Sequence, residues 1–344
     1  MAIWGKTADG TAVEIFALKS GNIEARVMAY GAHLVSVKAP DRNGKVADVV
    51  LGYDDLATYL RVPNSYIGAL IGRFGNRIGH GRFAIDGKNY QIPLNNGPNA
   101  LHGGPVGFDR YVWKAEEVAG GVEFTHVSPD GDMGFPGNLT AKVKYTLAGN
   151  TLRLDYHATT DKETVVNLTN HAYFNLRGND DGNILGHKVQ LSADHYTPVD
   201  SGLIPTGELA AAVAGTPLDF RTPHVVADRI EDKFEQMVRA GGYDHNFAVN
   251  GAAGTLRPAA RVIEPESGRT LTVETTEPGI QFYSGNFLDG SFTGRHGKVY
   301  AKRTGFCLET QHFPDAPNHP TFPSSELKPG QIYRSTMIYK FSTR

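Results

Sequence analysis

Residues 164–176, Thr-Val-Val-Asn-Leu-Thr-Asn-His-Ala-Tyr-Phe-Asn-Leu, combine side chains that can bind a ligand with side chains that can ionise. Alternate side chains of a β-strand point to opposite sides of its sheet, so a strand here would place Asn167, Thr169, His171 and Tyr173 on one face. That face has an imidazole and a phenol but no Lys or Glu, which a freely solvated face usually carries. We interpret it as the wall of a small-molecule cleft. A polar face that is solvated, or satisfied by hydrogen bonds within the protein, with a structural histidine would explain the same pattern.

A second candidate is Glu309, which lies in an apolar segment. The residues directly before it are Phe-Cys-Leu, and the pattern predicts a β-strand. A carboxylate in such surroundings needs hydrogen-bonding partners or takes a raised pKa. We therefore treat Glu309 as a candidate functional residue.

Two glycine-rich stretches supply further polar candidates. Residues 68–81 include Arg77 and five glycines, which indicate close backbone approach or positive φ. Residues 95–105 predict a turn-rich loop that presents His102, and loops held on a rigid scaffold often carry binding groups. The candidates are far apart along the chain, so only the fold can bring them together. They are Arg77, His102, His171, Tyr173, Asp244, Gln281 and Glu309.

Residues 79–84, Gly-His-Gly-Arg-Phe-Ala, formally match the dinucleotide-binding fingerprint, but we reject that interpretation. The motif must open a helix after a strand. Residues 82–92 instead predict a β-hairpin that turns at Asp86-Gly87.

The elements that must position these residues are short strands. The chain contains 40 Gly and 19 Pro, spread along its length, together with 17 Phe and 15 Tyr. Residues 121–127, 139–147 and 151–158 alternate between apolar and polar side chains and are separated by turn signals, which is typical of a β-sandwich or barrel. Helices are predicted only for a brief segment at 56–60 and near 228–238.

Composition limits the possible partners and the cellular location. The chain has 344 residues and a formal net charge of −2, so electrostatics do not favour binding to nucleic acid or to an anionic membrane. The single cysteine, Cys307, cannot form an intrachain disulfide, which fits a reducing compartment. We expect no secretory signal, since the first residues lack an apolar segment, and no membrane span, since no apolar run approaches about 20 residues. These features favour the cytoplasm.

Six segments resemble those of the aldose 1-epimerase (galactose mutarotase) family, in family order, from about Gly31 to the C-terminus. They are Gly72-Arg-Phe-Gly-Asn-Arg-Ile, Asn99-Ala-Leu-His-Gly-Gly, Asn170-His-Ala-Tyr-Phe-Asn-Leu, Gly242-Tyr-Asp-His-Asn-Phe, Glu277-Pro-Gly-Ile-Gln-Phe-Tyr-Ser-Gly-Asn-Phe and Gly305-Phe-Cys-Leu-Glu-Thr-Gln-His-Phe-Pro-Asp-Ala. The last three are long and specific.

The resemblance implies an all-β fold, a large antiparallel β-sandwich of the galactose mutarotase-like supersandwich type with few short helices. It implies that residues 1–344 form a single domain. It also implies an isomerase that interconverts the α and β anomers of free aldohexoses such as galactose and glucose. The ring would open by acid/base catalysis, rotate about C1–C2 and close again, which needs no cofactor and no metal.

The resemblance also implies roles for individual residues. Glu309 matches the catalytic base and His171 the catalytic acid. The matches to sugar-contacting positions are Arg77, His102, Asp244 and Gln281, with Asn76 and Tyr173 as further matches. We expect the apolar surroundings of Glu309 to raise its pKa, and a nearby carboxylate to favour the charged form of His171. Arg73 is expected to be structural and Cys307 to be a small core residue.

Three other interpretations stay open at the level of sequence. A non-catalytic sugar-binding sandwich would need the anchors but not the Glu309 and His171 pair. A metal hydrolase could use His102, His171 and Glu309, although the chain has no paired-His helix motif. A sugar-phosphate mutarotase should carry an additional basic cluster. The preferred aldose (galactose, glucose, xylose or arabinose) and the choice between monomer and homodimer are also open.

Overall fold

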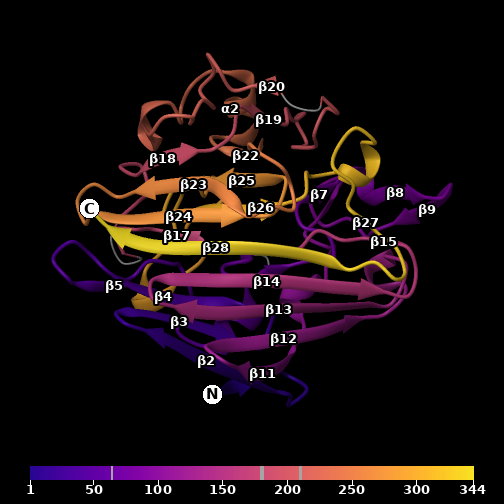
Figure 1. Cartoon of the computed structure of the whole chain (residues 1–344), viewed down its shortest axis with the longest axis horizontal. Coiled ribbons are helices and arrows are strands. Elements are labelled where there is room, and N and C mark those ends of the chain that lie inside the picture. The colour runs from indigo at the N-terminus through magenta and orange to yellow at the C-terminus, as the bar shows by residue number, and fades with distance from the viewer. Residues whose placement is uncertain (63–64, 179–181, 209–210) are drawn as a thin grey trace.

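The computed structural model describes residues 1–62, 65–178, 182–208 and 211–344. Three large sheets dominate the fold, and their neighbouring strands pair antiparallel. The nine-stranded sheet has the order β11 (Lys114–Val118), β12 (Gly121–Ser128), β13 (Leu139–Ala148), β14 (Thr151–Thr160), β28 (Tyr333–Thr343), β24 (Arg269–Thr275), β23 (Arg257–Ile263), β18 (Lys188–Leu191), β21 (His224–Val225). Figure 1 looks onto this sheet, with β28 crossing the centre of the view.

Two further sheets lie against the nine-stranded one. The six-stranded sheet has the order β17 (Tyr173–Phe174), β26 (Phe306–Gln311), β25 (Gly279–Tyr283), β22 (Asp244–Ala248), β19 (His195–Tyr196), β20 (Ala211–Ala212). The five-stranded sheet runs β1 (Ala2–Lys6), β2 (Ala12–Ser20), β3 (Ile23–Met28), β4 (Leu34–Pro40), β5 (Val46–Asp48). The two-stranded pairs are β6 (Leu70–Ile71) with β16 (Thr169–Asn170), β7 (Arg77–Ile78) with β10 (Ala100–Leu101), β8 (Arg82–Ile85) with β9 (Lys88–Gln91), and β15 (Thr164–Val165) with β27 (Glu326–Leu327).

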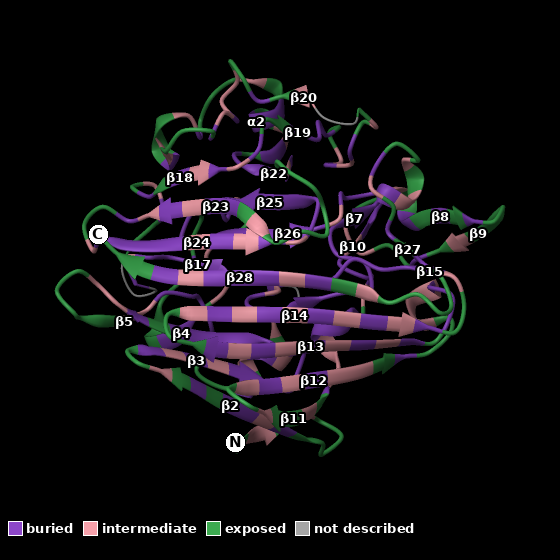
Figure 2. Cartoon of the chain, in the orientation of Figure 1, coloured by how far each residue is buried: buried purple, intermediate pink, exposed green. Residues whose placement is uncertain are grey.

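The core lies between the sheets. Strands β13 and β14 alternate between buried and partly exposed residues, so each turns one face inward (Figure 2). Across the core, Phe174 packs edge-on against Tyr339 at 4.9 Å between ring centroids, and Phe16 packs against Phe124 at 5.8 Å. These contacts join the nine-stranded sheet to the other two, and the predicted antiparallel β-sandwich is confirmed.

The segment 164–176 does not form one strand, so that prediction is wrong. It divides into β15, β16 and β17, which pair with three different partners. Two asparagine side chains interrupt the backbone pairing: Asn167 donates to the carbonyl of Gly75 at 3.0 Å, and Asn170 donates to the carbonyl of Gly68 at 3.0 Å. All the residues of the segment are buried, so its polar face is not solvated.

The two helices are short, as expected, but one begins later than predicted. Helix α1 (Leu56–Arg61) agrees with the prediction, and the side chain of Asp55 caps it by accepting from the N–H of Thr58 at 2.7 Å. Helix α2 (Glu235–Ala240) covers only the end of the predicted 228–238 segment. The side chain of Asp232 accepts from the N–H of Phe234 at 2.7 Å, a local turn that competes with an earlier helix start.

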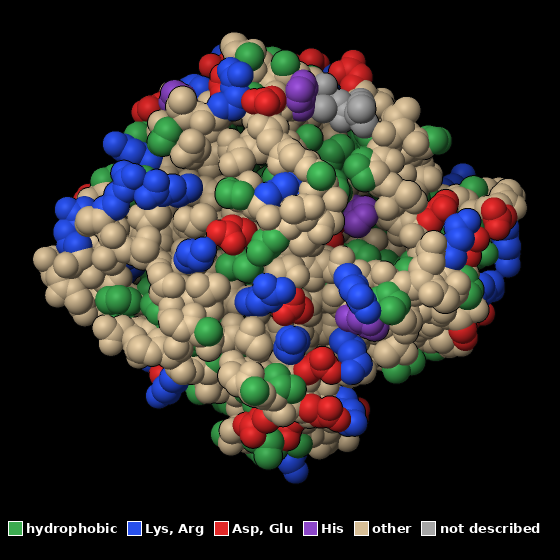
Figure 3. Space-filling model, in the orientation of Figure 1, with side chains coloured by type: hydrophobic (Ala, Val, Ile, Leu, Met, Phe, Trp, Pro, Cys, Tyr) green, Lys and Arg blue, Asp and Glu red, His purple; other side chains and the backbone are tan. Residues whose placement is uncertain are grey.

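Other features agree with the sequence. Residues 82–91 form the expected hairpin, so no helix follows the glycines of the rejected fingerprint. Arg73 is buried and donates to the carbonyls of Pro136 and Gly137 and to the hydroxyl of Ser128, which confirms its structural role. Within the described residues, no helix is long and apolar enough to cross a membrane. Basic and acidic side chains are mixed over the face shown in Figure 3.

Candidate active site

Strand register brings several candidate residues onto one face of the six-stranded sheet. Asp244 on β22 is opposite Tyr283 on β25, which is opposite Cys307 on β26. Gln281 on β25 is opposite Glu309 on β26. Because side chains alternate along each strand, residues two apart within these strands point to the same side.

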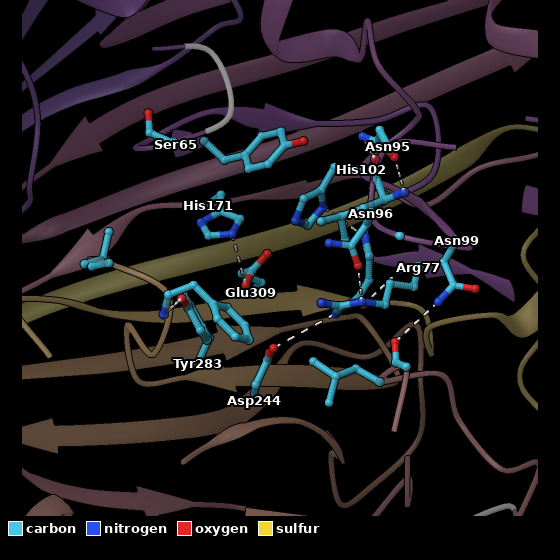
Figure 4. A pocket seen from close by; sticks show the side chains of 18 of the residues that line it. Ser65, Arg77, Asn95, Asn96, Asn99, His102, His171, Asp244, Tyr283 and Glu309 are labelled. Atoms are coloured by element: carbon cyan, nitrogen blue, oxygen red, sulfur yellow. Dashed lines mark hydrogen bonds and ion pairs between the residues drawn. The ribbon is translucent and has the colours of Figure 1, made fainter. Parts of the chain in front are cut away.

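A cavity of about 550 Å³ opens above this face. Several segments outside the sheet complete it, among them Asn76 and Arg77, at the start of β7, and the loop of residues 95–102. Figure 4 shows Glu309, Asp244 and Tyr283 on one side and His171, His102 and Arg77 facing them. The predicted site residues that line the cavity are Asn76, Arg77, His102, His171, Tyr173, Asp244 and Glu309.

Glu309 and His171 lie close together at the base of the site. Oε1 of Glu309 is 3.8 Å from Nε2 of His171, and only 2% and 5% of the two residues are exposed. Burial raises the pKa of Glu309 well above its usual value, helped by the nearby charge of Asp244 and opposed by Arg77. Burial also lowers the pKa of His171 to about 4. The expected direction for Glu309 is confirmed, but the expected preference for charged His171 is wrong in the free site, because burial disfavours the charged imidazole.

His102 is held in one protonation state. The backbone N–H of Asn76 donates to its Nδ1 at 3.1 Å, so the hydrogen of the neutral ring is on Nε2. Burial, followed by repulsion from His171 and Arg77, keeps its pKa well below the usual value. His102 can therefore serve as a neutral hydrogen-bond donor.

The same hydrogen bond disfavours a metal site. One potential ligand atom from each of His102, His171 and Glu309 lies within 4.8 Å of the others, as the metal-hydrolase interpretation requires. A metal-binding histidine usually donates its second ring N–H to an acceptor. His102 instead accepts there from the N–H of Asn76, so its other nitrogen carries a hydrogen rather than a free lone pair.

A buried ion pair between Arg77 and Asp244 also lines the cavity. Nη1 of Arg77 is 4.0 Å from Oδ2 of Asp244, and Nε of Arg77 donates to the side chain of Asn96 at 3.1 Å. Burial raises the pKa of Asp244, opposed by Arg77 and by a hydrogen bond from Gln281. The side chains of Arg77 and Asp244 both line the cavity, where they could bind the hydroxyls of a sugar ring.

Gln281 is placed differently from the other candidates. Its amide donates to Oδ1 of Asp244 at 2.6 Å, and its carbonyl accepts from Gln311 at 3.1 Å. It is not among the residues that line the cavity. The structure thus places Gln281 behind Asp244, where it orients that carboxylate.

Several residues around the cavity were missed by sequence reasoning. Tyr66 packs on both imidazoles, Asn96 holds Arg77, and Tyr283 lines the wall beside Asp244. Of these three residues, only Tyr283 could have been found from the sequence, because it shares a strand face with the candidate Gln281. Cys307 is buried, as expected, but its Sγ also lies 3.4 Å from Nδ1 of His171.

Comparisons with known proteins agree with this geometry. The sequence model of the aldose 1-epimerase family matches residues 14–340. A galactose mutarotase from Bos taurus is 47% identical over 96% of this chain and 94% of its own, and an aldose 1-epimerase from Escherichia coli K12 is 39% identical over 97% and 96%. The crystal structure of an aldose epimerase homologue from C. elegans superposes with a TM-score of 0.88 at 30% identity, covering 96% of this chain and 99% of the other. The chain therefore belongs to the aldose 1-epimerase family and, as an isomerase of that family, interconverts the α and β anomers of aldoses.

Proposed function

We propose that Glu309 is the base and His171 the acid of this anomer interconversion. The observation that carries the proposal is the 3.8 Å approach of their side chains on one wall of the cavity. The hydroxyl oxygen O1 and the ring oxygen O5 of an aldose are both bonded to C1. An acid and a base this close together can therefore reach both oxygens of one sugar.

The proton transfers balance within the pair. In the resting pair the proton is on Glu309, and sugar binding shifts it across the 3.8 Å gap to His171. Glu309 then takes the proton of the C1 hydroxyl while His171 gives a proton to O5, and the C1–O5 bond breaks to leave the open-chain aldehyde. C1 then rotates about C1–C2, and the reverse transfers close the ring on the other face. Glu309 and His171 together hold one proton both before and after ring opening. Burial disfavours the charged form of each residue, but it does not change this number. Nε2–H of His102 can donate to an oxygen near C1 without ionising.

The substrate is held by the side chains away from the proton-transfer pair. Arg77 and Asp244 bind ring hydroxyls through charge-assisted hydrogen bonds, with Asn76, Tyr173 and His102 as further contacts. Gln281 acts through Asp244 rather than on the sugar. Gripping the distal hydroxyls leaves C1 free to rotate, so both anomers fit one site.

We propose galactose and glucose as substrates. The bovine relative, which is named a galactose mutarotase, supports this proposal. We further propose that residues 1–344 act as a single domain, because one apolar cluster joins β2 to β28. We also propose that the protein acts in the cytoplasm, which the free thiol of the buried Cys307 supports. It acts as a monomer or homodimer and has no nucleic-acid or membrane partners.

Polarimetry of freshly dissolved α-anomers tests the proposed substrates. Catalytic amounts of protein should accelerate the relaxation of α-galactose and α-glucose to their equilibrium rotations far above the buffer rate. Xylose and arabinose serve as comparison sugars. If xylose or arabinose relaxes quickly and the two hexoses do not, the proposed substrates are wrong.

The catalysed rate should show a bell-shaped dependence on pH. The pKa of His171 is lowered to about 4, so below that pH both groups are protonated and no base remains. The pKa of Glu309 is raised, so the pair loses its one proton only when the pH passes that higher value, where no acid remains. We expect kcat/KM, corrected for the buffer reaction, to fall on the acid side near pH 4. An acid limb at the ordinary histidine pKa, about 6.5, would contradict this assignment.

Asp244→Asn should weaken substrate binding more than turnover. The substitution keeps the shape but removes the charge that faces Arg77, so a charge-assisted hydrogen bond to a ring hydroxyl becomes a neutral one. We expect KM to rise about tenfold, the equivalent of about 1.4 kcal/mol, while kcat falls less than about threefold. Progress curves at several galactose concentrations give both constants. A fall in kcat with unchanged KM would show that Asp244 takes part in the chemistry.

A further inference from the structure

Tyr66 lines the cavity but has no part in the proton transfers described above. Its ring meets that of His102 edge-on, with 4.7 Å between centroids, and stacks near that of His171 at 6.0 Å and an angle of 27°. The two imidazoles meet each other edge-on at 5.2 Å. Tyr66 thus contacts both histidines of the site at once.

The backbone fixes Tyr66 relative to His171. The N–H of Gly68 donates to the carbonyl of His171 at 3.0 Å, and the N–H of His171 donates to the carbonyl of Ala69 at 2.8 Å. Tyr66 itself has φ of 51°, a left-handed conformation that is rare for a bulky residue and persists only where the surroundings impose it. The tyrosine ring is therefore held in place by the same short stretch that pairs with the histidine.

A second link joins Tyr66 to the loop that carries His102. The side chain of Asn95 hydrogen-bonds the Tyr66 hydroxyl, and burial together with nearby Asp109 raises the pKa of that hydroxyl to about 12, so it stays protonated. Asn95 also accepts from the N–H of Leu101 at 2.7 Å and donates to its carbonyl at 3.0 Å, one residue before His102. Tyr66 bridges the two segments that supply the imidazoles.

We propose that Tyr66 is a positioning residue, whose ring fixes the mutual orientation of the His171 and His102 imidazoles and covers them from water. The proposal rests on the proposed acid role of His171. Proton transfer requires the donor to point at O5, and a small misplacement of a catalytic group can cost about 10²-fold in rate. The ring, rather than the hydroxyl, makes both contacts with the imidazoles.

Two substitutions of Tyr66 test the proposal. Tyr66→Phe keeps the ring and should retain kcat within about threefold, since it loses only the link to Asn95. Tyr66→Ala removes the ring and should lower kcat about tenfold or more, with KM changed by less than about threefold. The matched control is Tyr90→Ala, which removes a half-buried tyrosine that stacks on Phe83 outside the cavity. It should lower the melting temperature but leave kcat unchanged.

Each outcome distinguishes the alternatives. Equal kcat for wild type and Tyr66→Ala would overturn the positioning role, as would a loss confined to KM or a loss of the same size in Tyr90→Ala. His171→Gln, measured in the same polarimetric assay, separates this proposal from the one on which it rests. If His171→Gln loses turnover and Tyr66→Ala does not, only the positioning role fails. If His171→Gln keeps full turnover, the acid assignment fails instead.

Discussion

Replacing Glu309 with Gln is expected to lower kcat about 10²–10⁴-fold, the usual contribution of a positioned acid or base. The amide has nearly the same size and can still hydrogen-bond, but it cannot accept the proton of the C1 hydroxyl. The buried setting leaves Glu309 with few partners: it is only 2% exposed, and its Oε2 has no hydrogen-bond partner among the described residues. Sugar binding through Arg77 and Asp244 should persist, so KM should change little.

A Glu–His pair outside the cavity supplies the matched control for this substitution. Oε2 of the buried Glu277 lies 2.7 Å from Nδ1 of the partly buried His312, and neither residue lines the cavity. Glu277→Gln should lower the melting temperature, because it removes the charge that raises the pKa of His312, but it should not lower kcat. If Glu309→Gln turns over galactose at the wild-type rate, Glu309 is not the base.

Local patterns along the sequence predicted the sandwich and, together with the family resemblance, seven of the residues that line the cavity. Alternation along residues 139–147 and 151–158 indicated strands with one buried face, and β13 and β14 show that alternation. Glu309 was prominent because a carboxylate among Phe, Cys and Leu is chemically unusual at any position. Such features are visible in one segment at a time.

What the sequence could not predict depends on contacts between distant segments. The asparagine amides that divide 164–176 into three strands bond to backbone at Gly68 and Gly75, about a hundred positions away. Tyr66 reaches His102 only because two loops meet above the six-stranded sheet. Gln281 faces Asp244 instead of the cavity, a difference of a few ångströms that strand alternation does not resolve.

The protonation of His171 was mispredicted for a related physical reason. A carboxylate beside an imidazole suggested an ion pair, since opposite charges favour each other at short range. Both groups, however, are almost fully buried, and removal of water disfavours each charged form separately. The resting pair therefore holds its proton in the neutral arrangement, and a bound sugar must favour the charged one through its own hydroxyls.

His171→Gln should also lower kcat about 10²–10⁴-fold, because Gln cannot deliver a proton to O5. The matched control is His312→Gln, which makes the same change in the Glu277–His312 pair outside the cavity and should reduce stability without reducing kcat. The double variant Glu309→Gln/His171→Gln gives the sharper measurement. If the two residues act as one proton-transfer unit, the double variant should be no slower than the slower single variant by more than about threefold. If the loss of kcat in the double variant equals the product of the two single losses, each group acts alone. If His171→Gln keeps wild-type turnover, another residue is the acid, and the Nε2–H of His102 is the nearest candidate.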